Sequence, residues 1–268
     1  MARDATARVA ARVTRHIDTV DVAGIAFQLS CRFPKPSFWA RRHPEFVTRR
    51  RPNVVIRIEY EEHFRGRAGR PVGDTVADAA DVRRQGPGLL VSTGYYRAAA
   101  DVRHGRVAVR MAAGFDVAGL MRTLAALWLL ERGTLLLRAA CFGPDVSATI
   151  TCGHPDRATP SSAIVGWFAV TPRPDGVSVR PTPFVDHDGP LGTSSRRATT
   201  LRLPGAEAGT PRLGTAMAVR VLLPSVWQAD RRRPAVERTL DLATRIVATL
   251  RGDEVGMLNP AREEAAVG

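Results

Sequence analysis

The chain has 268 residues, of which 44% are hydrophobic and 24% are charged, so it can bury a full core in one large or two small domains. No stretch reaches the roughly 20 uncharged apolar residues of a membrane-spanning helix. The best apolar run, residues 117–130, is short and contains Arg122. Residues 1–15 are charged throughout and lack an apolar secretory core, so a cytoplasmic protein with no membrane segment is expected.

The net charge of +13 suggests an anionic partner, but the composition weakens that inference. Lys35 is the only lysine, and the many arginines, glycines and prolines are typical of a GC-rich genome whatever the protein does. The local arginine clusters lack the regular aromatic residues that stack on bases, so nucleic acid is not the expected partner. Three widely spaced cysteines predict buried free thiols rather than disulfides.

The first half of the chain is expected to be mostly β. Residues 2–16 are expected to form a short helix or a loose end. Residues 31–51 are rich in proline and arginine and are expected to be irregular. His104 and Gly105 predict a hairpin turn. Alternating and β-branched residues predict five strands in this half, at residues 22–30, 54–60, 89–93, 98–102 and 106–111.

The second half is expected to combine strands with two helices. Asp116 can cap a helix whose apolar residues recur at three and four spacing up to Gly133. Pro234 begins a second amphipathic helix that ends at Gly252. Two buried strands are expected at residues 134–142 and 146–152, and shorter ones at 177–180, 199–203 and 216–223.

A glycine-led segment, residues 153–160, follows the second buried strand, where a phosphate-binding loop would lie. Such a loop needs consecutive backbone N–H groups, a helix behind them and a lysine for the phosphate oxygens. Pro155 and Pro160 each remove an N–H donor, and Thr159 stands where the lysine is needed. The candidate anion ligands of this degenerate loop are Gly153, Arg157, Thr159, Ser161, Ser162 and, on the preceding strand, Arg138.

The order of these pieces resembles bacterial kinases similar to HPr kinase/phosphorylase and phosphoenolpyruvate carboxykinase, over about residues 22–260. The matching positions are Gly133, Ala139, Ala140, Gly153, Pro183 and Phe184, and Arg138 stands where the family has histidine. The resemblance implies an α/β fold in which a largely β N-terminal half continues into a P-loop core with a mixed sheet and few helices. Together with the element pattern, this predicts a β-rich region at 1–115, a core at 116–260 and a disordered tail at 261–268.

The resemblance also implies which reactive groups should be present, and this chain lacks them. Between the loop and Thr182, the family places carboxylates that hold Mg²⁺, whereas Asp175 is the only acidic residue in residues 166–180 and lies in a turn sequence. We therefore expect a pseudokinase without catalytic residues, metal or cofactor. Its expected role is to bind or assemble with a peptide, protein or carrier partner, with a homo-oligomer as one form.

Two alternatives stay open. A divergent ATP- and Mg²⁺-dependent serine kinase could bind phosphate through Arg157 or Arg138, because arginine binds phosphate bidentately. A basic nucleic-acid-binding module is the second alternative. The sequence around His187 and the spacing of Cys152 and His154 favour a polar turn and a structural thiol over metal sites.

Overall fold

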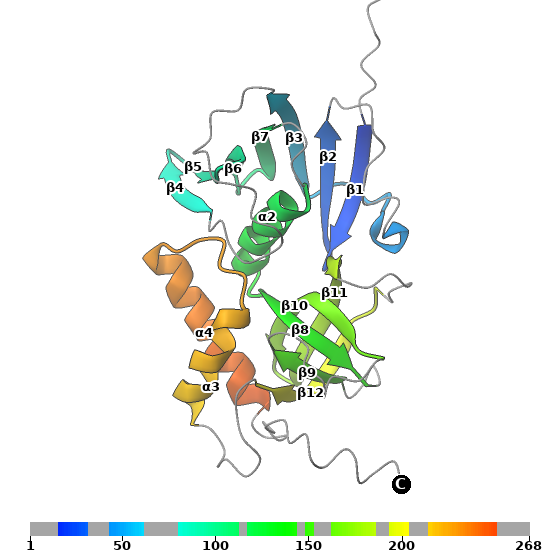
Figure 1. The fold of residues 1–268 in the computed structure, drawn as a ribbon, viewed down its shortest axis with the longest axis vertical. Coiled ribbons are helices and arrows are strands. Elements are labelled where there is room, and N and C mark those ends of the chain that lie inside the picture. Colours follow the sequence, from blue (N-terminus) through cyan, green and yellow to red (C-terminus); the bar gives the residue numbers. More distant parts are fainter. Residues whose placement is uncertain are drawn as a thin grey trace, which may run out of the picture.

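The structure is a computed structural model that describes residues 16–31, 43–61, 80–112, 117–143, 148–152, 162–185, 193–203 and 214–250. Figure 1 shows an open β-sheet in the upper half of the molecule and a β-barrel in the lower half. The expected mixed α/β class is confirmed, because the described residues form two mixed sheets and only three α-helices. The P-loop kinase core remains a prediction.

Seven strands form the open sheet, which we call sheet A, in the order β1-β2-β3-β7-β6-β5-β4. The neighbours β2, β3 and β7 run parallel at its centre, and the remaining pairs are antiparallel. The strands are β1 (His16–Val22), β2 (Ile25–Cys31), β3 (Val54–Glu61), β4 (Asp81–Gln85), β5 (Gly88–Ser92), β6 (Tyr96–Asp101) and β7 (Arg106–Ala112).

One face of sheet A packs on helix α2 (Val117–Glu131). Strand alternation turns Val54, Ile56 and Ile58 to this face, where each is at most 3% exposed. The ring of Phe27 on β2 meets the ring of Trp128 on α2 edge-on, with 6.2 Å between their centroids. The predicted helix and the predicted strands 54–60, 89–93, 98–102 and 106–111 are therefore confirmed.

Five strands form the closed barrel, in the order β10-β11-β12-β9-β8. Only β12 and β9 run parallel; the other described pairs are antiparallel. The strands are β8 (Leu135–Phe142), β9 (Ala148–Cys152), β10 (Ile164–Arg173), β11 (Gly176–Val185) and β12 (Arg196–Arg202). The apolar residues of barrel, α2 and sheet A belong to one core cluster.

Two helices pack beside the barrel. Helix α3 (Thr215–Leu222) contacts α4 (Arg233–Leu250), and α4 also contacts β10, β11 and β12. Two short 3-10 helices, η1 (Pro44–Phe46) and η2 (Leu223–Ser225), complete the described elements. None of the described helices is long and apolar enough to cross a membrane.

Two sequence predictions are wrong. The single strand expected at 22–30 is a hairpin of β1 and β2, because Ala23 and Gly24 have φ angles of 53° and 90° and reverse the chain there. The strand expected at 216–223 is helix α3, whose buried residues Ala218, Val219 and Leu222 lie on one helical face. Its short run of alternating small and apolar residues fits both periods, so local pattern could not distinguish them.

Candidate functional site

Of the predicted anion ligands, Gly153, Arg157, Thr159 and Ser161 lie outside the described residues. Arg138 is on β8, and Cys152, the last residue of β9, pairs with its neighbour Ala139. Arg138 therefore lies at the level where β9 leads into the predicted loop. Ser162 is exposed two residues before β10, five residues from Trp167, the partner of Arg138. Strand β10 begins at Ile164, which pairs with Cys141, three residues beyond Arg138 on β8 and about 10 Å from it. Ser162 precedes Ile164, so the register does not place it beside Arg138.

The surroundings of Arg138 form an arginine–tryptophan cluster. Arg138 is half-buried and shares a face of the β8–β10 pair with Trp167. Arg122 of α2 places its guanidinium carbon 5.4 Å from the Trp167 ring and 4.8 Å from the Trp227 ring. The two rings meet edge-on, with centroids 5.1 Å apart. These cation–π contacts join α2 to the barrel. From the sequence, Arg122 was only the charged residue that interrupts an apolar run, and the structure shows it at the centre of this cluster.

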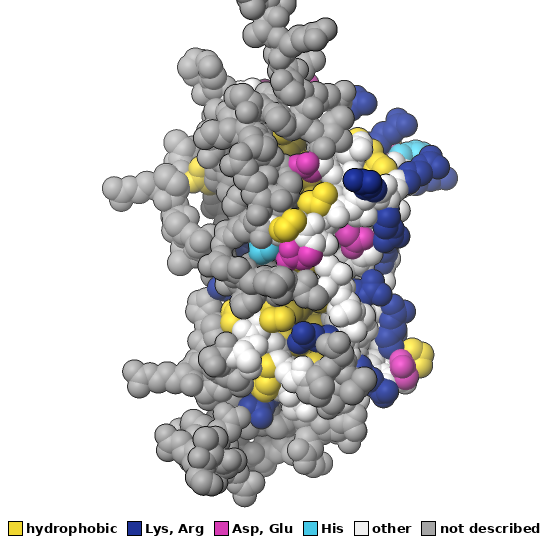
Figure 2. Space-filling model, turned by 90° about the vertical axis from the view of Figure 1, so that its right-hand side faces the viewer, with side chains coloured by type: hydrophobic (Ala, Val, Ile, Leu, Met, Phe, Trp, Pro, Cys, Tyr) yellow, Lys and Arg dark blue, Asp and Glu magenta, His cyan; other side chains and the backbone are white. Residues whose placement is uncertain are grey.

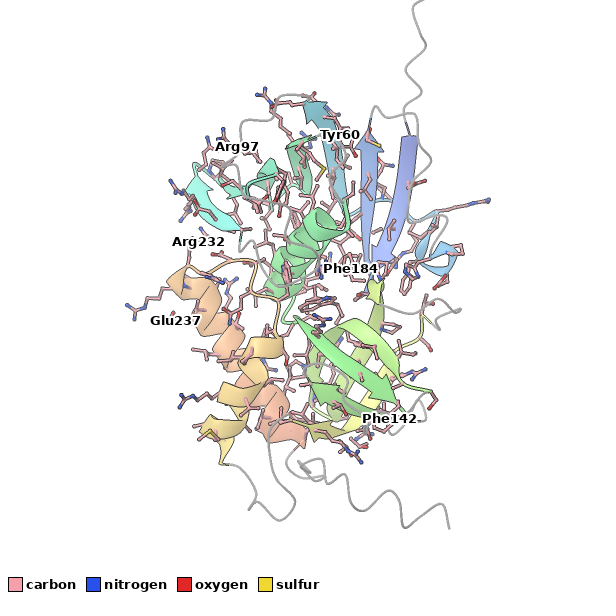
Figure 3. All side chains as sticks on the ribbon, viewed as in Figure 1. Tyr60, Arg97, Phe142, Phe184, Arg232 and Glu237 are labelled. Atoms are coloured by element: carbon pink, nitrogen blue, oxygen red, sulfur yellow. The ribbon has the colours of Figure 1, made fainter. Side chains whose placement is uncertain are left out.

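Pro183 and Phe184, two of the positions matched to the resembled family, lie with Thr182 within β11, and all three are buried. The hydroxyl of Thr182 donates a hydrogen bond to the carbonyl oxygen of Trp167 across the β10–β11 pair and also accepts one from the backbone N–H of Phe184. Figure 3 places Phe184 at the end of the barrel nearest the strands of sheet A. In the described structure this segment therefore ties β10 to β11 at the end of the barrel that faces sheet A.

The acidic candidates give no metal centre within the described part of the chain. Asp175 lies in the turn between β10 and β11, as the sequence predicted. Asp186, His187, Asp188 and His154 lie outside the described residues. The described residues contain no group of three or more His, Cys, Asp or Glu side chains placed to hold a metal ion.

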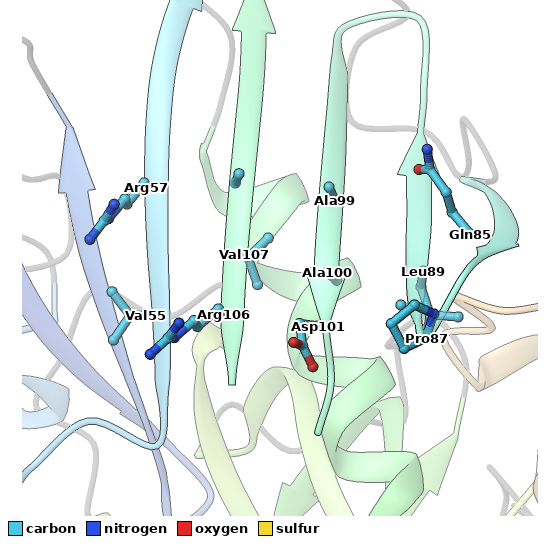
Figure 4. Close-up of a pocket in the computed structure, with 12 residues that line it drawn as sticks. Val55, Arg57, Gln85, Pro87, Leu89, Ala99, Ala100, Asp101, Arg106 and Val107 are labelled. Atoms are coloured by element: carbon cyan, nitrogen blue, oxygen red, sulfur yellow. The ribbon is translucent and has the colours of Figure 1, made fainter. Parts of the chain in front are cut away.

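A groove of about 830 Å³ lies on the face of sheet A opposite α2, and sequence reasoning missed it. Strand alternation that buries Ile56 turns Val55 and Arg57 outwards. Ala99 and Ala108 are directly paired across β6 and β7, and both are exposed. Figure 4 shows Arg57 and Arg106 on one side of this alanine floor, and Gln85 and Pro87 on the other. We call this feature the sheet A groove; its outer residues are Val55, Arg57, Gln85, Pro87, Ala99, Asp101, Arg106 and Ala108.

Arg57 and Arg106 give the groove positive charge that is not neutralised by a carboxylate of the described residues. Arg57 pairs directly with Ala108, and Arg106 lies two residues before Ala108 on β7, so the two arginines are diagonal neighbours at about 7 Å. No carboxylate among the described residues forms an ion pair with either of them, whereas Arg110 and Arg83 at the margins pair with Glu61 and Asp81. Two guanidinium groups are thus available to a ligand beside a floor without bulky side chains.

Among the described residues that line the groove, Asp101 is the one acidic side chain, and the turn between β6 and β7 holds it. One carboxylate oxygen of Asp101 accepts a hydrogen bond from the backbone N–H of His104 at 3.0 Å. The other oxygen lies 2.8 Å from Nδ1 of the His104 ring. The backbone hydrogen bond and then the side-chain hydrogen bond lower the pKa of the Asp101 carboxyl below its ordinary value. The carboxylate therefore stays charged and oriented toward the turn, although Asp101 lies opposite Arg106 in the register.

No protein-family model matches the chain, and no curated protein matches it.

Proposed function

We propose that the protein is a non-catalytic binding component, a degenerate relative of the HPr-kinase-like proteins, that docks a protein or peptide partner in the sheet A groove. The observation that carries the proposal is the exposed face around Ala99 and Ala108 beside the parallel strands β2, β3 and β7. In all-parallel sheets both faces are normally covered, and β2, β3 and β7 form such a parallel stretch within the mixed sheet A. Helix α2 covers one face of sheet A, and a partner would cover the other.

The chemistry of the groove favours an acidic polypeptide. Arg57 and Arg106 offer planar donor groups that match carboxylates, and the alanine floor lets a partner backbone or helix approach closely. None of the described residues that line the groove is aromatic, so the stacking platforms of single-strand binders are missing there. An acidic helix or extended segment fits this face better than bases do.

Position-specific crosslinking tests the proposal. A diazirine-bearing amino acid replaces Ala108 at the groove floor, and the same substitution at Leu240, exposed on α4, serves as the control. After irradiation of the cells that make the protein, we expect a discrete, protease-sensitive adduct from position 108 and none of equal size from position 240. The Arg57→Glu and Arg106→Glu double variant should lose the adduct, and the isolated partner should bind the wild type in purified form.

The same experiment distinguishes the alternatives. The described parts of the barrel, within residues 135–203, carry only arginines as charged residues, apart from Asp175. Figure 2 shows basic side chains in a column along the right-hand edge of the molecule, over the heights of both sheets. A nuclease-sensitive adduct would favour a nucleic-acid-binding module on this basic surface. Calorimetric binding of ATP that Arg138→Gln or Arg157→Ala abolishes would instead favour the kinase. No adduct at position 108 beyond the control would refute groove docking.

A further inference from the structure

A second cavity lies where sheet A meets the barrel, and it is independent of the sheet A groove. It has a volume of about 310 Å³ and lies between the β1–β2 turn, the segment after η1, and β11. We call it the junction pocket; the residues that carry the argument are Asp21, Gly24, Glu45, Arg50, Phe46 and Arg180. A volume near the lower end of ligand-binding cavities suits a small molecule.

The turn between β1 and β2 fits around the guanidinium of Arg180. Gly24 has a φ angle of 90°, which favours glycine, and a Cβ at this position would lie 3.2 Å from an Nη atom of Arg180. The backbone N–H of Gly24 donates to the Asp21 carboxylate at 2.7 Å. Glycine thus satisfies the turn and leaves room for the arginine side chain from the other sheet.

Two arginines line the junction pocket, and their environments differ. Arg50 forms an ion pair with the second carboxylate oxygen of Asp21 at 3.0 Å. Arg180 is half-buried, and no carboxylate of the described chain forms an ion pair with it. Its donor groups are therefore open to a ligand in the pocket, and guanidinium binds a carboxylate through two parallel hydrogen bonds.

The charges of the pocket limit how much negative charge a ligand can bring. Asp21 and Arg50 offset each other, and the remaining charged groups of the described residues that line the pocket are Arg180 and Glu45. His43 Nδ1 lies 3.7 Å from Glu45 Oε1, but His43 is itself buried. A ligand with one negative charge can be matched by Arg180, whereas a polyphosphate would place further charge near Asp21 and Glu45.

Phe46, Val47 and Pro181 supply the smaller, apolar part of a wall that is mostly polar. Phe46 is 3% exposed, Pro181 is buried, and Val47 is 40% exposed beside them. We propose that the junction pocket binds a small monocarboxylate with a short apolar body, whose carboxylate is held by Arg180 and whose body packs on Phe46 and Pro181. A free organic acid and the carboxyl terminus of a peptide share this chemistry.

The proposal is tested by following backbone amide signals of the full chain by NMR while probes are added. The probes are isovalerate, the neutral isostere isovaleramide, an N-acetylated Ala-Ala-Val peptide with a free carboxyl end, and pyrophosphate. We expect isovalerate to shift the signals of Gly24 and Arg180 in a saturable way, and isovaleramide to bind about tenfold more weakly or worse. Binding of the peptide at the same amides would identify a chain terminus as the source of the carboxylate, and no peptide binding would identify a free acid.

Three variants make the test specific. Arg180→Gln should weaken isovalerate binding about tenfold or more, whereas Arg173→Gln, an exposed arginine of the same β10–β11 hairpin, should leave it unchanged. Glu45→Gln removes the opposing charge and should tighten binding severalfold, so loss of fold cannot mimic the pattern. Equal shifts with the amide, tighter binding of pyrophosphate to the wild type, or unchanged binding by Arg180→Gln would each overturn the proposal.

Discussion

Arg122 lies where α2 meets the barrel, with its guanidinium facing the rings of Trp167 and Trp227. A guanidinium loses less hydration energy on burial than an ammonium, and aromatic faces attract its charge. The side chain thus joins α2 to β10 and to the segment after η2 across a largely apolar junction. Its contribution should be visible in stability.

Arg122→Ala should lower the free energy of unfolding by about 1–3 kcal/mol, because it removes two cation–π contacts and the packing of a half-buried side chain. Urea unfolding followed by tryptophan fluorescence measures this change. Arg245→Ala, at an exposed position on α4, is the matched control and should change stability by less than about 0.5 kcal/mol. Equal effects of the two substitutions would contradict a structural role for the cluster.

Arginine also shows why the candidate site could be predicted only in part. Arg138 was predicted as an anion ligand because it lies on a strand before a glycine-led loop. In the structure it lies at the level where β9 ends. No sequence pattern separates Arg57, Arg122 and Arg180 from the many other arginines. Their differences arise from cross-strand neighbours and contacts between distant segments, which carry no local pattern.

The turn between β6 and β7 sets the register of the centre of sheet A. Gly105, at a φ of 63°, packs its backbone against Asn53, and its carbonyl oxygen accepts a hydrogen bond from the N–H of Val55 at 2.7 Å. Asn53 in turn accepts from the N–H of Ala26 through its side chain at 2.9 Å. The turn therefore links β2, β3 and β7 at one end, next to Val55 and Arg106 of the sheet A groove.

Gly105→Ala should lower the free energy of unfolding by about 2 kcal/mol or more, because a Cβ would overlap the Asn53 carbonyl oxygen and the left-handed backbone disfavours alanine. Chemical denaturation measures the loss. Gly119→Ala on α2, where a Cβ meets open space, is the control and should stabilise the protein by up to about 1 kcal/mol. Similar destabilisation by both would show that the Asn53 contact is not the cause.

Elements with strong local periodicity could be predicted, and those defined by distant pairing could not. Val54, Ile56 and Ile58 alternate with polar residues, and α2 repeats its apolar residues at helical spacing, so both were found. Strand β4 was missed because Val82 is its only buried residue. The barrel is closed by the parallel pairing of β12 with β9, two segments far apart in the sequence. Neither a turn sequence nor a local periodicity predicts such a contact.

At the scale of the whole molecule, sheet A, α2 and the barrel share one apolar core, and two of the three cysteines lie inside it. Cys141 and Cys152 are at most 1% exposed, whereas Cys31, on β2 of sheet A, is half-buried. The prediction of free thiols is confirmed for all three. Their burial means that core packing can be probed through the protonation of a thiol.

Burial raises the pKa of the Cys152 thiol far above its ordinary value near 9.0. The folded state therefore keeps this proton while the unfolded chain releases it, so the free energy of unfolding should fall as pH rises above about 9, by about 1.4 kcal/mol per pH unit from this one group. Denaturation of the wild type and of Cys152→Ala between pH 7.5 and about 10.5 measures the difference.

At pH 7.5 the variant should be less stable than the wild type because of the cavity. Its stability should fall less steeply as the pH rises, since residue 152 no longer titrates. Parallel pH profiles would mean that the thiol is ionised or hydrated in the folded state, and that the barrel core opens to solvent at this strand.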